Sequence, residues 1–572
     1  MTVDAAATGA APPRPAADRS WAQRPPYEWL LWLLAGVGVA VVMTWPLAAH
    51  LSAVVPHDPA DPLAQVWVTA WGGHALLHQP LSLFNGNTFW PEGPSLAFSD
   101  SLLGYLPAGL LGSGPAAALA RYNVLFLSAY ALPFAGAALL ARELGVRPAA
   151  AAVAGAAFSW APLRMAQEGH LNILSTGAIA LALFLLLAGY RRASSRQIVL
   201  GWLVAAWQVS LGFGLGIYFC YLLALMAIVA GVEWLRRGRP RPHRPTVLGT
   251  LVGGSAFLVL VVLCVTPYLQ VLQRYPDAPR SRAEVAFYSP PLRSFFAADA
   301  QSRVWGHATE VVRTTLSWAP EQTLFPGLVV TVLAVVGLTR RRSSSRLRVA
   351  LAISFVVGAL LSLGLSLHGG SFTYGPLYDL LPGWKGLRTP GRLSVFWSLA
   401  LALLAGLGAQ RLLEGTSGLR VARPRHRAAL GSGLALACAA LVLWEGSPNL
   451  PLPSVPTEPA GLSGLAGPQV HLPASPFDDD VYMLWSTDGF PRIANGNASY
   501  LPPALNAVRG MTTFPDAPSV LLLRSRGYRT VVLHLDRAVG TPWADAASRS
   551  LDGLGVTSRR VGSLVIYDLG RG

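Results

Sequence analysis

The chain has 572 residues, of which 52% are hydrophobic and only 13% are charged. Soluble domains carry about 25% charged residues, so this composition excludes an ordinary soluble protein and indicates a membrane protein. The formal net charge of +16 does not indicate a nucleic-acid partner, because the basic residues form short bursts between apolar segments. The bursts are Arg191–Arg196, Arg236–Arg244, Arg340–Arg348 and Arg420–Arg427.

The N-terminal part sets the expected orientation. Residues 1–27 are rich in Ala, Pro and Arg and lack an apolar core, which predicts a disordered cytoplasmic tail. After a first span at 28–48, no Lys or Arg occurs before position 121, so 49–120 is expected to be an external loop. Within it, Leu102–Leu111 is apolar but short and contains Pro107, so it should lie at the outer interface without crossing.

The same rule, which places arginine bursts inside, predicts about eleven transmembrane helices within residues 28–445. The ten spans after the first are expected near 121–141, 148–162, 171–190, 197–212, 215–235, 246–267, 324–339, 347–367, 393–412 and 428–445.

The C-terminal part differs in composition from the spans. A Pro-rich linker at 446–459 precedes residues 460–572, which have the size of a small domain. Three short β-like runs and one helical run occur there: Gln469–Leu472, Thr530–Leu535, Ser563–Asp568 and Ala517–Arg526. The expected fold is therefore an all-α polytopic membrane protein with a small external α/β domain.

Three aspartates of the first loop are candidates for catalysis. Asp58 and Asp61 follow the first span, and Asp100 lies near the end of the loop. A carboxylate just above a membrane can take a proton from a hydroxyl group or hold a divalent cation. The alternative is structural, because Asp before Pro favours turns and helix caps, and Asp100 could cap Ser101–Leu111.

Charged residues also occur in the loop that reads RMAQEGHLN. Arg164, Glu168 and His170 are spaced as on a helix between two apolar segments. Charged groups at membrane depth cost about 2.5–3.5 kcal/mol each on insertion scales and usually face a polar cavity. A plain solvated connection is the alternative.

The last external loop before a span reads LPGWKGLRTPGRLSVF and is basic on the side where basic residues are rare. Arginine forks match phosphate oxygens bidentately, so Lys385, Arg388 and Arg392 suggest an anionic lipid headgroup or a diphosphate ligand. Snorkelling of these side chains to lipid headgroups is the alternative.

Several stretches resemble one class of membrane enzymes. The first loop, with DPADPLAQVWVTAW, LFNGNTFWPEG and LAFSD, is similar to the bacterial integral-membrane glycosyltransferases of the GT-C fold. RMAQEGHLNILS, LRTPGR and STDGFPRIANGNASYLP resemble the same group, so the likeness extends over nearly the whole chain. The branch that it resembles is largely uncharacterised.

The resemblance implies a catalytic acidic residue in the first external loop, a polyprenyl-phosphate sugar donor and an external C-terminal domain. Asp58 or Asp61 would match the catalytic aspartate and Asp100 a second acidic residue. Arg164, His170, Arg388 and Arg392 would surround the donor phosphate. Position favours Asp58 as the base, because it lies nearer the end of the first span, and Asp61 as a cap of the following helix.

The predicted function is inverting transfer of a sugar to a saccharide, lipid or protein acceptor at the non-cytoplasmic face of the cell membrane. A divalent cation is a possible cofactor. Trp67, Trp71 and His74 recur at helical spacing, and the tryptophans could stack on sugar rings or anchor at the interface. The rival functions are a transporter or flippase of a lipid-linked saccharide and a scaffold that binds saccharide through its tail domain.

Overall fold

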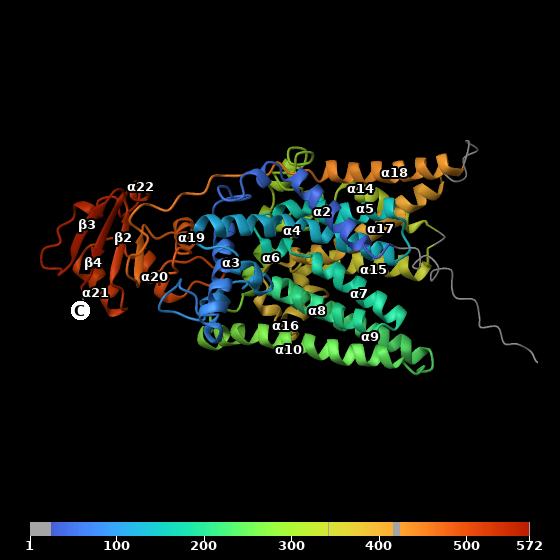
Figure 1. Cartoon of the computed structure of the whole chain (residues 1–572), viewed down its shortest axis with the longest axis horizontal. Helices are drawn as coiled ribbons and strands as arrows, with labels where there is room; N and C mark the ends of the chain where they lie inside the picture. The colour runs from blue at the N-terminus through green and yellow to red at the C-terminus, as the bar shows by residue number, and fades with distance from the viewer. Residues whose placement is uncertain (1–24, 341–342, 416–423, 571–572) are drawn as a thin grey trace, which may run out of the picture.

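A computed structural model of the chain describes residues 25–340, 343–415 and 424–570. The predicted N-terminal tail lies outside the described residues except for 25–27. The described chain forms a long bundle of helices with a C-terminal unit containing a β-sheet at one end (Figure 1).

A helix occurs at each predicted span. These helices are α2 (Glu28–Met43), α4 (Gly114–Glu143), α5 (Pro148–Trp160), α7 (Gly177–Arg192), α8 (Ser195–Leu211), α9 (Phe213–Arg236), α10 (Arg244–Arg274), α14 (Leu328–Leu338), α15 (Ser345–Ser362), α17 (Ser394–Gly415) and α18 (Pro424–Glu445). Six of the described helical segments are long and apolar enough to cross a membrane. The protein is therefore a multi-pass membrane protein, while the total of about eleven spans stays a prediction.

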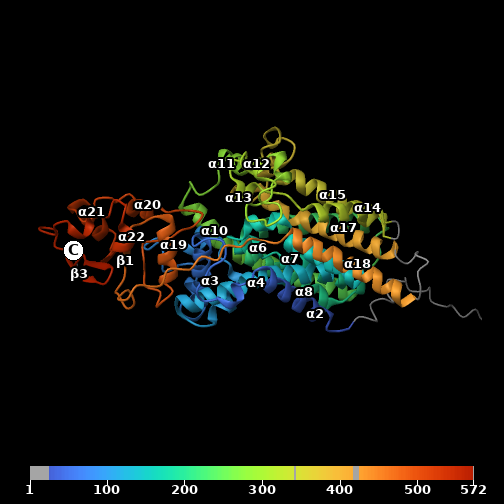
Figure 2. The same ribbon diagram turned by 90° about the horizontal axis from the view of Figure 1, so that it is seen from above.

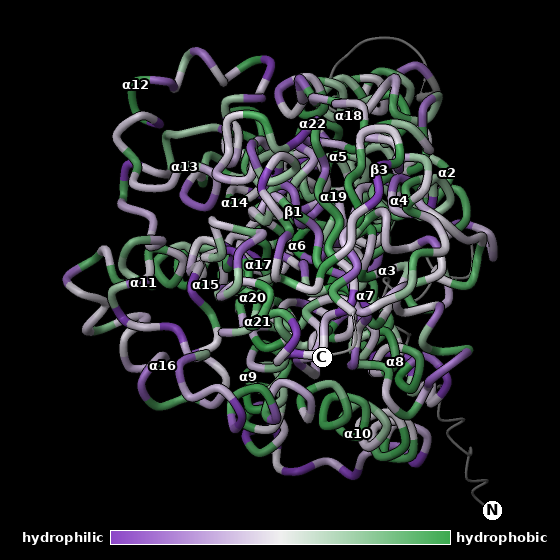
Figure 3. Tube along the Cα trace, turned by 90° about the vertical axis from the view of Figure 1, so that its left-hand side faces the viewer, coloured by the Kyte–Doolittle hydropathy of each residue, from purple (hydrophilic) through white to green (hydrophobic). Residues whose placement is uncertain are grey.

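The helix α17 lies at the centre of the bundle. Its apolar window is 94% buried inside the protein, whereas the windows of α10 and α15 are only 22% and 11% buried. A helix that is apolar on all sides needs apolar surroundings. Neighbouring helices provide these surroundings for α17, and we expect the membrane to provide them for α10. Seen along the long axis, α8, α9 and α10 are largely hydrophobic (Figure 3).

Small residues let α14 approach α17 closely. A Cβ atom at Gly408 would overlap the Leu333 carbonyl oxygen, and one at Gly337 would overlap the Leu404 carbonyl oxygen. Such close backbone approach is common between membrane helices, because the hydrophobic effect contributes little to the association of helices in lipid.

The first loop is ordered by α3 (Asp61–His78), which starts at the second aspartate. The apolar run Leu102–Leu111 forms a 3₁₀ helix at Leu103–Leu110. Eight residues are too few to span a bilayer, which is consistent with the prediction that this run does not cross.

The C-terminal unit contains a four-stranded sheet in the order β1-β2-β4-β3. β1 is parallel to β2, and the other neighbours are antiparallel. The elements are β1 (Gln469–Leu472), α19 (Pro476–Trp485), α20 (Pro503–Arg509), α21 (Ala517–Ser525), β2 (Thr530–His534), α22 (Leu535–Ala538), β3 (Thr557–Val561) and β4 (Leu564–Asp568). Sequence analysis predicted three of these strands and α21 but missed β3, an exposed edge strand that reads TSRRV.

The first loop and the C-terminal unit share a hydrophobic core. Trp67 and Trp71 of α3 belong to the same buried cluster as Tyr482 and Trp485 of α19. The backbones also pair, because the Ile493 N–H donates to the Asn87 carbonyl at 2.8 Å and the Trp90 N–H donates to the Ile493 carbonyl at 3.0 Å.

Several shorter helices lie toward the C-terminal unit. They are α6 (Leu171–Leu174), α11 (Arg282–Tyr288), α12 (Glu310–Arg313), α13 (Ala319–Gln322) and α16 (Tyr374–Leu380). Among them, α6 is buried inside the protein. Figure 2 shows α11, α12 and α13 grouped outside the long helices and toward the C-terminal unit. The turn between α9 and α10 lies at the opposite end of the bundle (Figure 1).

This arrangement predicts opposite labelling of two exposed positions. In a variant that lacks the three free cysteines Cys220, Cys264 and Cys438, we expect Asp545→Cys to react with an impermeant thiol reagent added outside the cell. Arg239→Cys, in the α9–α10 turn, should react only after the membrane is permeabilised, because its arginine-rich turn should be cytoplasmic. Labelling of position 239 but not 545 in intact cells would reverse the topology.

Candidate active site

The two first-loop aspartates have different contacts. The Asp58 carboxylate accepts the Ala60 backbone N–H at 3.0 Å and lies 2.6 Å from His57 Nδ1. Asp61 is the first residue of α3, and that helix has no side-chain cap. The expected cap role of Asp61 is therefore wrong, and Asp58 closes the turn before the helix instead.

Asp61 faces His170 from the loop before α6. Its Oδ2 lies 3.2 Å from His170 Nε2, and its side chain is 57% exposed. Gln65, one turn further along α3, holds that loop in place. Its amide donates to the Gly169 carbonyl at 3.1 Å and its oxygen accepts the Leu171 N–H at 2.7 Å.

Two arginines lie close enough to Asp61 to affect its ionisation. Burial opposes the charged form, but His170, Arg392 and Arg388 outweigh burial and hold the pKa of the Asp61 carboxyl below its usual value. Asp61 is therefore a carboxylate at neutral pH, with open surface on one side and cations on the other.

Each of these arginines is held by a glutamate. Arg392 forms a two-pronged ion pair with the buried Glu321 of α13, with Nε 3.2 Å from Oε2. Arg388 Nη1 lies 3.3 Å from Glu284 Oε1, and its guanidinium carbon lies 5.1 Å from the centre of the Tyr288 ring. Glutamates thus orient both forks, and Arg388 keeps more exposed surface than Arg392.

Asp100 belongs to the same charged cluster. The Asn172 side-chain amide donates to its Oδ2, and the Gly214 backbone N–H donates to its Oδ1 at 3.2 Å. Its carboxylate also interacts electrostatically with Arg392. The 3₁₀ helix at Leu103–Leu110 has no side-chain cap, so the alternative of Asp100 as a cap is wrong.

We call Asp61, Asp100, His170, Arg388 and Arg392 the charged cluster. It brings together residues from the first loop, the loop before α6 and the loop before α17. An acceptor hydroxyl beside Asp61 could lose its proton to the carboxylate while the arginines bind an anion.

Other predicted site residues serve the protein framework. Arg164 is buried, with Nη1 donating to Thr176 Oγ1 at 3.0 Å and Nη2 donating to the Leu174 carbonyl at 2.7 Å. Its guanidinium therefore holds the α6–α7 junction and is not open to a phosphate. Lys385 is exposed, and its carbonyl oxygen accepts the Arg280 N–H at 2.9 Å.

The first-loop aromatic residues are also structural. Trp67 and Trp71 are 1% and 3% exposed, and their ring N–H groups donate to Asn87 Oδ1 at 2.8 Å and to the Leu83 carbonyl at 2.9 Å. Both rings are buried inside the protein and therefore present no open face to a sugar or to lipid. The His74 ring contacts that of Phe490 of the C-terminal unit in a tilted arrangement, with ring centres 4.3 Å apart.

Sequence reasoning missed the residues that support the cluster. Gln65 and Asn172 lie within the stretches DPADPLAQVWVTAW and RMAQEGHLNILS but had no predicted role, and Glu284 and Glu321 lie outside the quoted stretches. Each of the four acts on a partner far away in the chain. The segment that contains Glu321 carries several other charged residues, so no local signal marks this glutamate. Asp480 of α19 was missed too; it is buried, accepts from Asn497 Nδ2 at 3.0 Å and interacts electrostatically with Asp61.

A divalent cation receives no support from the arrangement of side chains. Within residues 25–340, 343–415 and 424–570, no group of three or more His, Cys, Asp or Glu side chains lies together as metal ligands would.

A family model described as "Domain of unknown function (DUF6311)" matches residues 34–442. The chain belongs to this family. The DUF6311 match includes every residue of the charged cluster and ends before the C-terminal unit. No curated protein matches the chain.

Two solved structures are similar to this DUF6311 protein. The oligosaccharyltransferase of Archaeoglobus fulgidus, solved with a tethered acceptor peptide, has a TM-score of 0.43 and 15% identity, over 90% of this chain and 70% of its own. ArnT from Cupriavidus metallidurans in the apo state has a TM-score of 0.34 and 13% identity, over 97% and 99%. Both are membrane glycosyltransferases of the GT-C fold, the class that the first-loop motif resembles. TM-scores this low carry no argument about the reaction.

Glu168 gives a prediction about pH. Its side chain is buried, Tyr130 donates to Oε1 at 3.2 Å, and burial together with Asp299 raises the pKa of Glu168 to about 8. The unfolded chain loses this proton at about pH 4.3, so the stability that the neutral group contributes is lost as pH rises toward 8.

We expect Glu168→Gln, which stays neutral, to gain thermal stability relative to the native protein between about pH 4.3 and 8. The measurement is the unfolding midpoint in detergent across that range. Glu310→Gln, at a more exposed carboxylate, should track the native protein at all pH values. If the difference in unfolding midpoint between Glu168→Gln and the native protein stays constant with pH, the raised pKa of Glu168 is contradicted.

Proposed function

We propose that this protein is an inverting membrane glycosyltransferase that moves a sugar from a polyprenyl-phosphate donor to an acceptor at the non-cytoplasmic face. The observation that carries the proposal is the position of Asp61, an ionised and half-exposed carboxylate, beside His170 and within the field of Arg388 and Arg392. Carboxylate and guanidinium groups are the two chemical parts that such a displacement needs.

The proposed step is a single displacement. The acceptor hydroxyl oxygen attacks the anomeric carbon from the face opposite the phosphate, and the bond between that carbon and the phosphate oxygen breaks. The proton of the hydroxyl passes to Asp61. The electron pair of the broken bond stays on the polyprenyl phosphate, whose growing negative charge Arg388 and Arg392 stabilise.

The arginines have unequal roles in this proposal. Arg392 is largely neutralised by the buried Glu321 and is best placed to fix the geometry of the cluster. Arg388 is 36% exposed and shares Glu284 with Arg280, so its fork has donors left for a phosphate oxygen. Asp100, held by Asn172, balances the positive charge on the other side of Arg392.

The location of the cluster supports a lipid-linked donor. The loop before α17 leads directly from Arg392 into an apolar segment of span length, so a phosphate bound there lies beside the end of a transmembrane helix. A polyprenyl chain could remain in the membrane while its phosphate reaches the arginines. The resemblance of the first-loop motif to GT-C enzymes points the same way.

The direct test of the function is lipid analysis of a reaction. Purified protein in lipid nanodiscs would be incubated with a radiolabelled polyprenyl-phosphate sugar and a membrane extract as the source of acceptor. A glycosyltransferase consumes the donor and releases polyprenyl phosphate, whereas a transporter or flippase leaves the donor intact.

Replacing Asp61 tests the proposed base. Asp61→Asn keeps the shape of the side chain but removes the proton acceptor, so turnover should fall about 100-fold or more. Asp58→Asn, whose amide oxygen can still accept the Ala60 N–H, should leave stability and most of the activity unchanged. Both variants would be compared at equal membrane abundance. Near-normal turnover by Asp61→Asn would place the base elsewhere, with Asp100 as the next candidate.

Arg388 tests the phosphate contact. Arg388→Ala should lower kcat/KM for the donor by about 1.5–3 kcal/mol, or about 10- to 150-fold, the range for hydrogen bonds to charged groups. Arg388→Lys should recover only part of this loss, because lysine keeps the charge but loses the fork.

The matched control is Arg282→Ala, which removes an exposed arginine paired with Asp379 on the same side of the protein. It should leave donor use unchanged, since exposed ion pairs contribute only about 0–1 kcal/mol. Donor use at the native rate by Arg388→Ala would show that this arginine does not bind the phosphate.

A further inference from the structure

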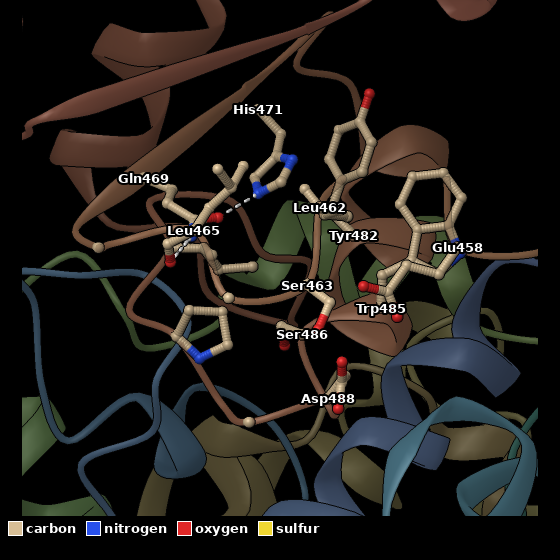
Figure 4. A pocket seen from close by; sticks show the side chains of 15 residues that line it. Glu458, Leu462, Ser463, Leu465, Gln469, His471, Tyr482, Trp485, Ser486 and Asp488 are labelled. Atoms are coloured by element: carbon tan, nitrogen blue, oxygen red, sulfur yellow. Dashed lines mark hydrogen bonds between the residues drawn. The ribbon is translucent and has the colours of Figure 1, made fainter. Parts of the chain in front are cut away.

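The C-terminal unit contains a cavity that the proposed reaction does not use. Its volume is about 260 Å³, and it lies between the linker, β1, α19 and the turn that follows α19. Figure 4 shows the Tyr482 and Trp485 rings together on one side and the Gln469–His471 pair on another. The residues that matter for its chemistry are Glu458, Gln469, His471, Tyr482, Trp485 and Asp488.

One wall of the cavity is polar and uncharged. Gln469 and His471 are only 1% and 3% exposed, and burial lowers the pKa of His471 to about 3, so its ring is neutral. His471 Nε2 lies 3.1 Å from Gln469 Oε1, and Gln469 Nε2 donates to the Leu465 carbonyl at 2.8 Å. An amide oxygen can only accept, so His471 Nε2 carries the proton.

His534 fixes this wall from behind. Its Nε2 lies 3.0 Å from His471 Nδ1, which must accept because the proton of His471 is on the other nitrogen. These hydrogen bonds give the wall a fixed shape, and His534 Nδ1 at its far end is buried without a partner among the described residues.

The second wall presents aromatic carbon. The ring centres of Tyr482 and Trp485 are 5.7 Å apart, and both side chains are almost fully buried. Their polar ends are used by the protein, since Trp485 Nε1 donates to the Pro456 carbonyl at 2.9 Å and the Tyr482 hydroxyl donates to the Pro473 carbonyl at 3.2 Å. What these rings can offer to a ligand is apolar surface.

Two carboxylates complete the cavity. Glu458 is half-buried, and its burial together with the nearby Asp488 raises the pKa of Glu458 to about 7. Neither carboxylate forms an ion pair or a side-chain hydrogen bond with another described residue. The exposed Asp488, and Glu458 when it is ionised, can only accept hydrogen bonds, so they suit a ligand with several donor groups.

We infer that this cavity binds a single sugar unit, with Glu458 and Asp488 accepting hydrogen bonds from its hydroxyl or amino groups. A sugar ring carries donors around its edge and carbon-bound hydrogen on its faces, which matches carboxylates beside an aromatic wall. The volume lies just below the range of about 300–1,000 Å³ for sites of drug-sized ligands, so the occupant is small.

The cavity is joined to α3 by hydrogen bonds. Pro491, which lines it, accepts from Asn87 Nδ2 at 2.8 Å, and Asn87 Oδ1 accepts from Trp67 Nε1 at 2.8 Å. Trp67 lies on the helix that begins at Asp61. A saccharide acceptor held in the cavity would thus be bound by a part of the chain fixed to the proposed base.

The test is equilibrium binding of simple sugars to the full-length protein in nanodiscs, without any donor. Saturation-transfer NMR would be recorded with methyl hexosides and methyl hexosaminides as probes. We expect at least one probe to bind, and Asp488→Asn and Glu458→Gln each to weaken it five-fold or more. Asp545→Asn, at an exposed carboxylate of the same unit outside the cavity, should bind like the native protein.

The two probe types distinguish the donor groups. Binding of hexosides indicates hydroxyl donors, and binding of hexosaminides alone indicates an ammonium group on the carboxylates. Failure of every probe to bind, or binding unchanged in both carboxylate variants, would overturn the inference. Because no donor lipid is present, this result is independent of glycosyl transfer: a protein that binds sugar here but consumes no donor would be a scaffold.

Discussion

The packing of α3 against the C-terminal unit is the contact on which the rest of the outer half of the protein depends. The amide of Asn87 joins the Trp67 ring nitrogen on one side to the Pro491 carbonyl on the other, and the Asn87 and Trp67 side chains are buried. Buried polar groups are costly when unpaired, so this amide fits one relative placement of the two parts. Because Asp61 is in the first turn of α3, this contact also fixes the position of Asp61.

Paired charges explain how so many ionised groups can gather above the spans. Each arginine of the charged cluster has a carboxylate partner, and Glu321 and Glu284 are both largely sheltered from water. Removing charges from water costs several kcal/mol per ion unless the pair geometry is good. In the proposed reaction, a cluster balanced in this way would hold the phosphate without a large excess of positive charge, which would favour release of the phosphate after transfer.

Much of the fold was accessible from the sequence, because apolar length and the distribution of arginine report spans and loops directly. The strands that face the core were accessible too, whereas β3 was not, since its five residues are exposed or half-exposed and carry no apolar alternation. The candidate site was predicted less completely. Local sequence could not tell which aspartate of DPADP closes the turn, and it could not pair Arg392 with Glu321, which is 71 positions away. The burial of Trp67 and Trp71 depends on α19, more than 400 positions later, so no local pattern could reveal it.

The edge position of β3 has a consequence for the behaviour of the protein in a crowded membrane. An unpaired strand edge is a template for a strand from another copy, and membrane anchoring keeps copies at the same height, where their edges can meet. Adjacent arginines, Arg559 and Arg560, occupy the middle of this strand. Two such edges brought together would place like charges opposite each other, so the strand protects neighbouring copies from joining into a continuous sheet.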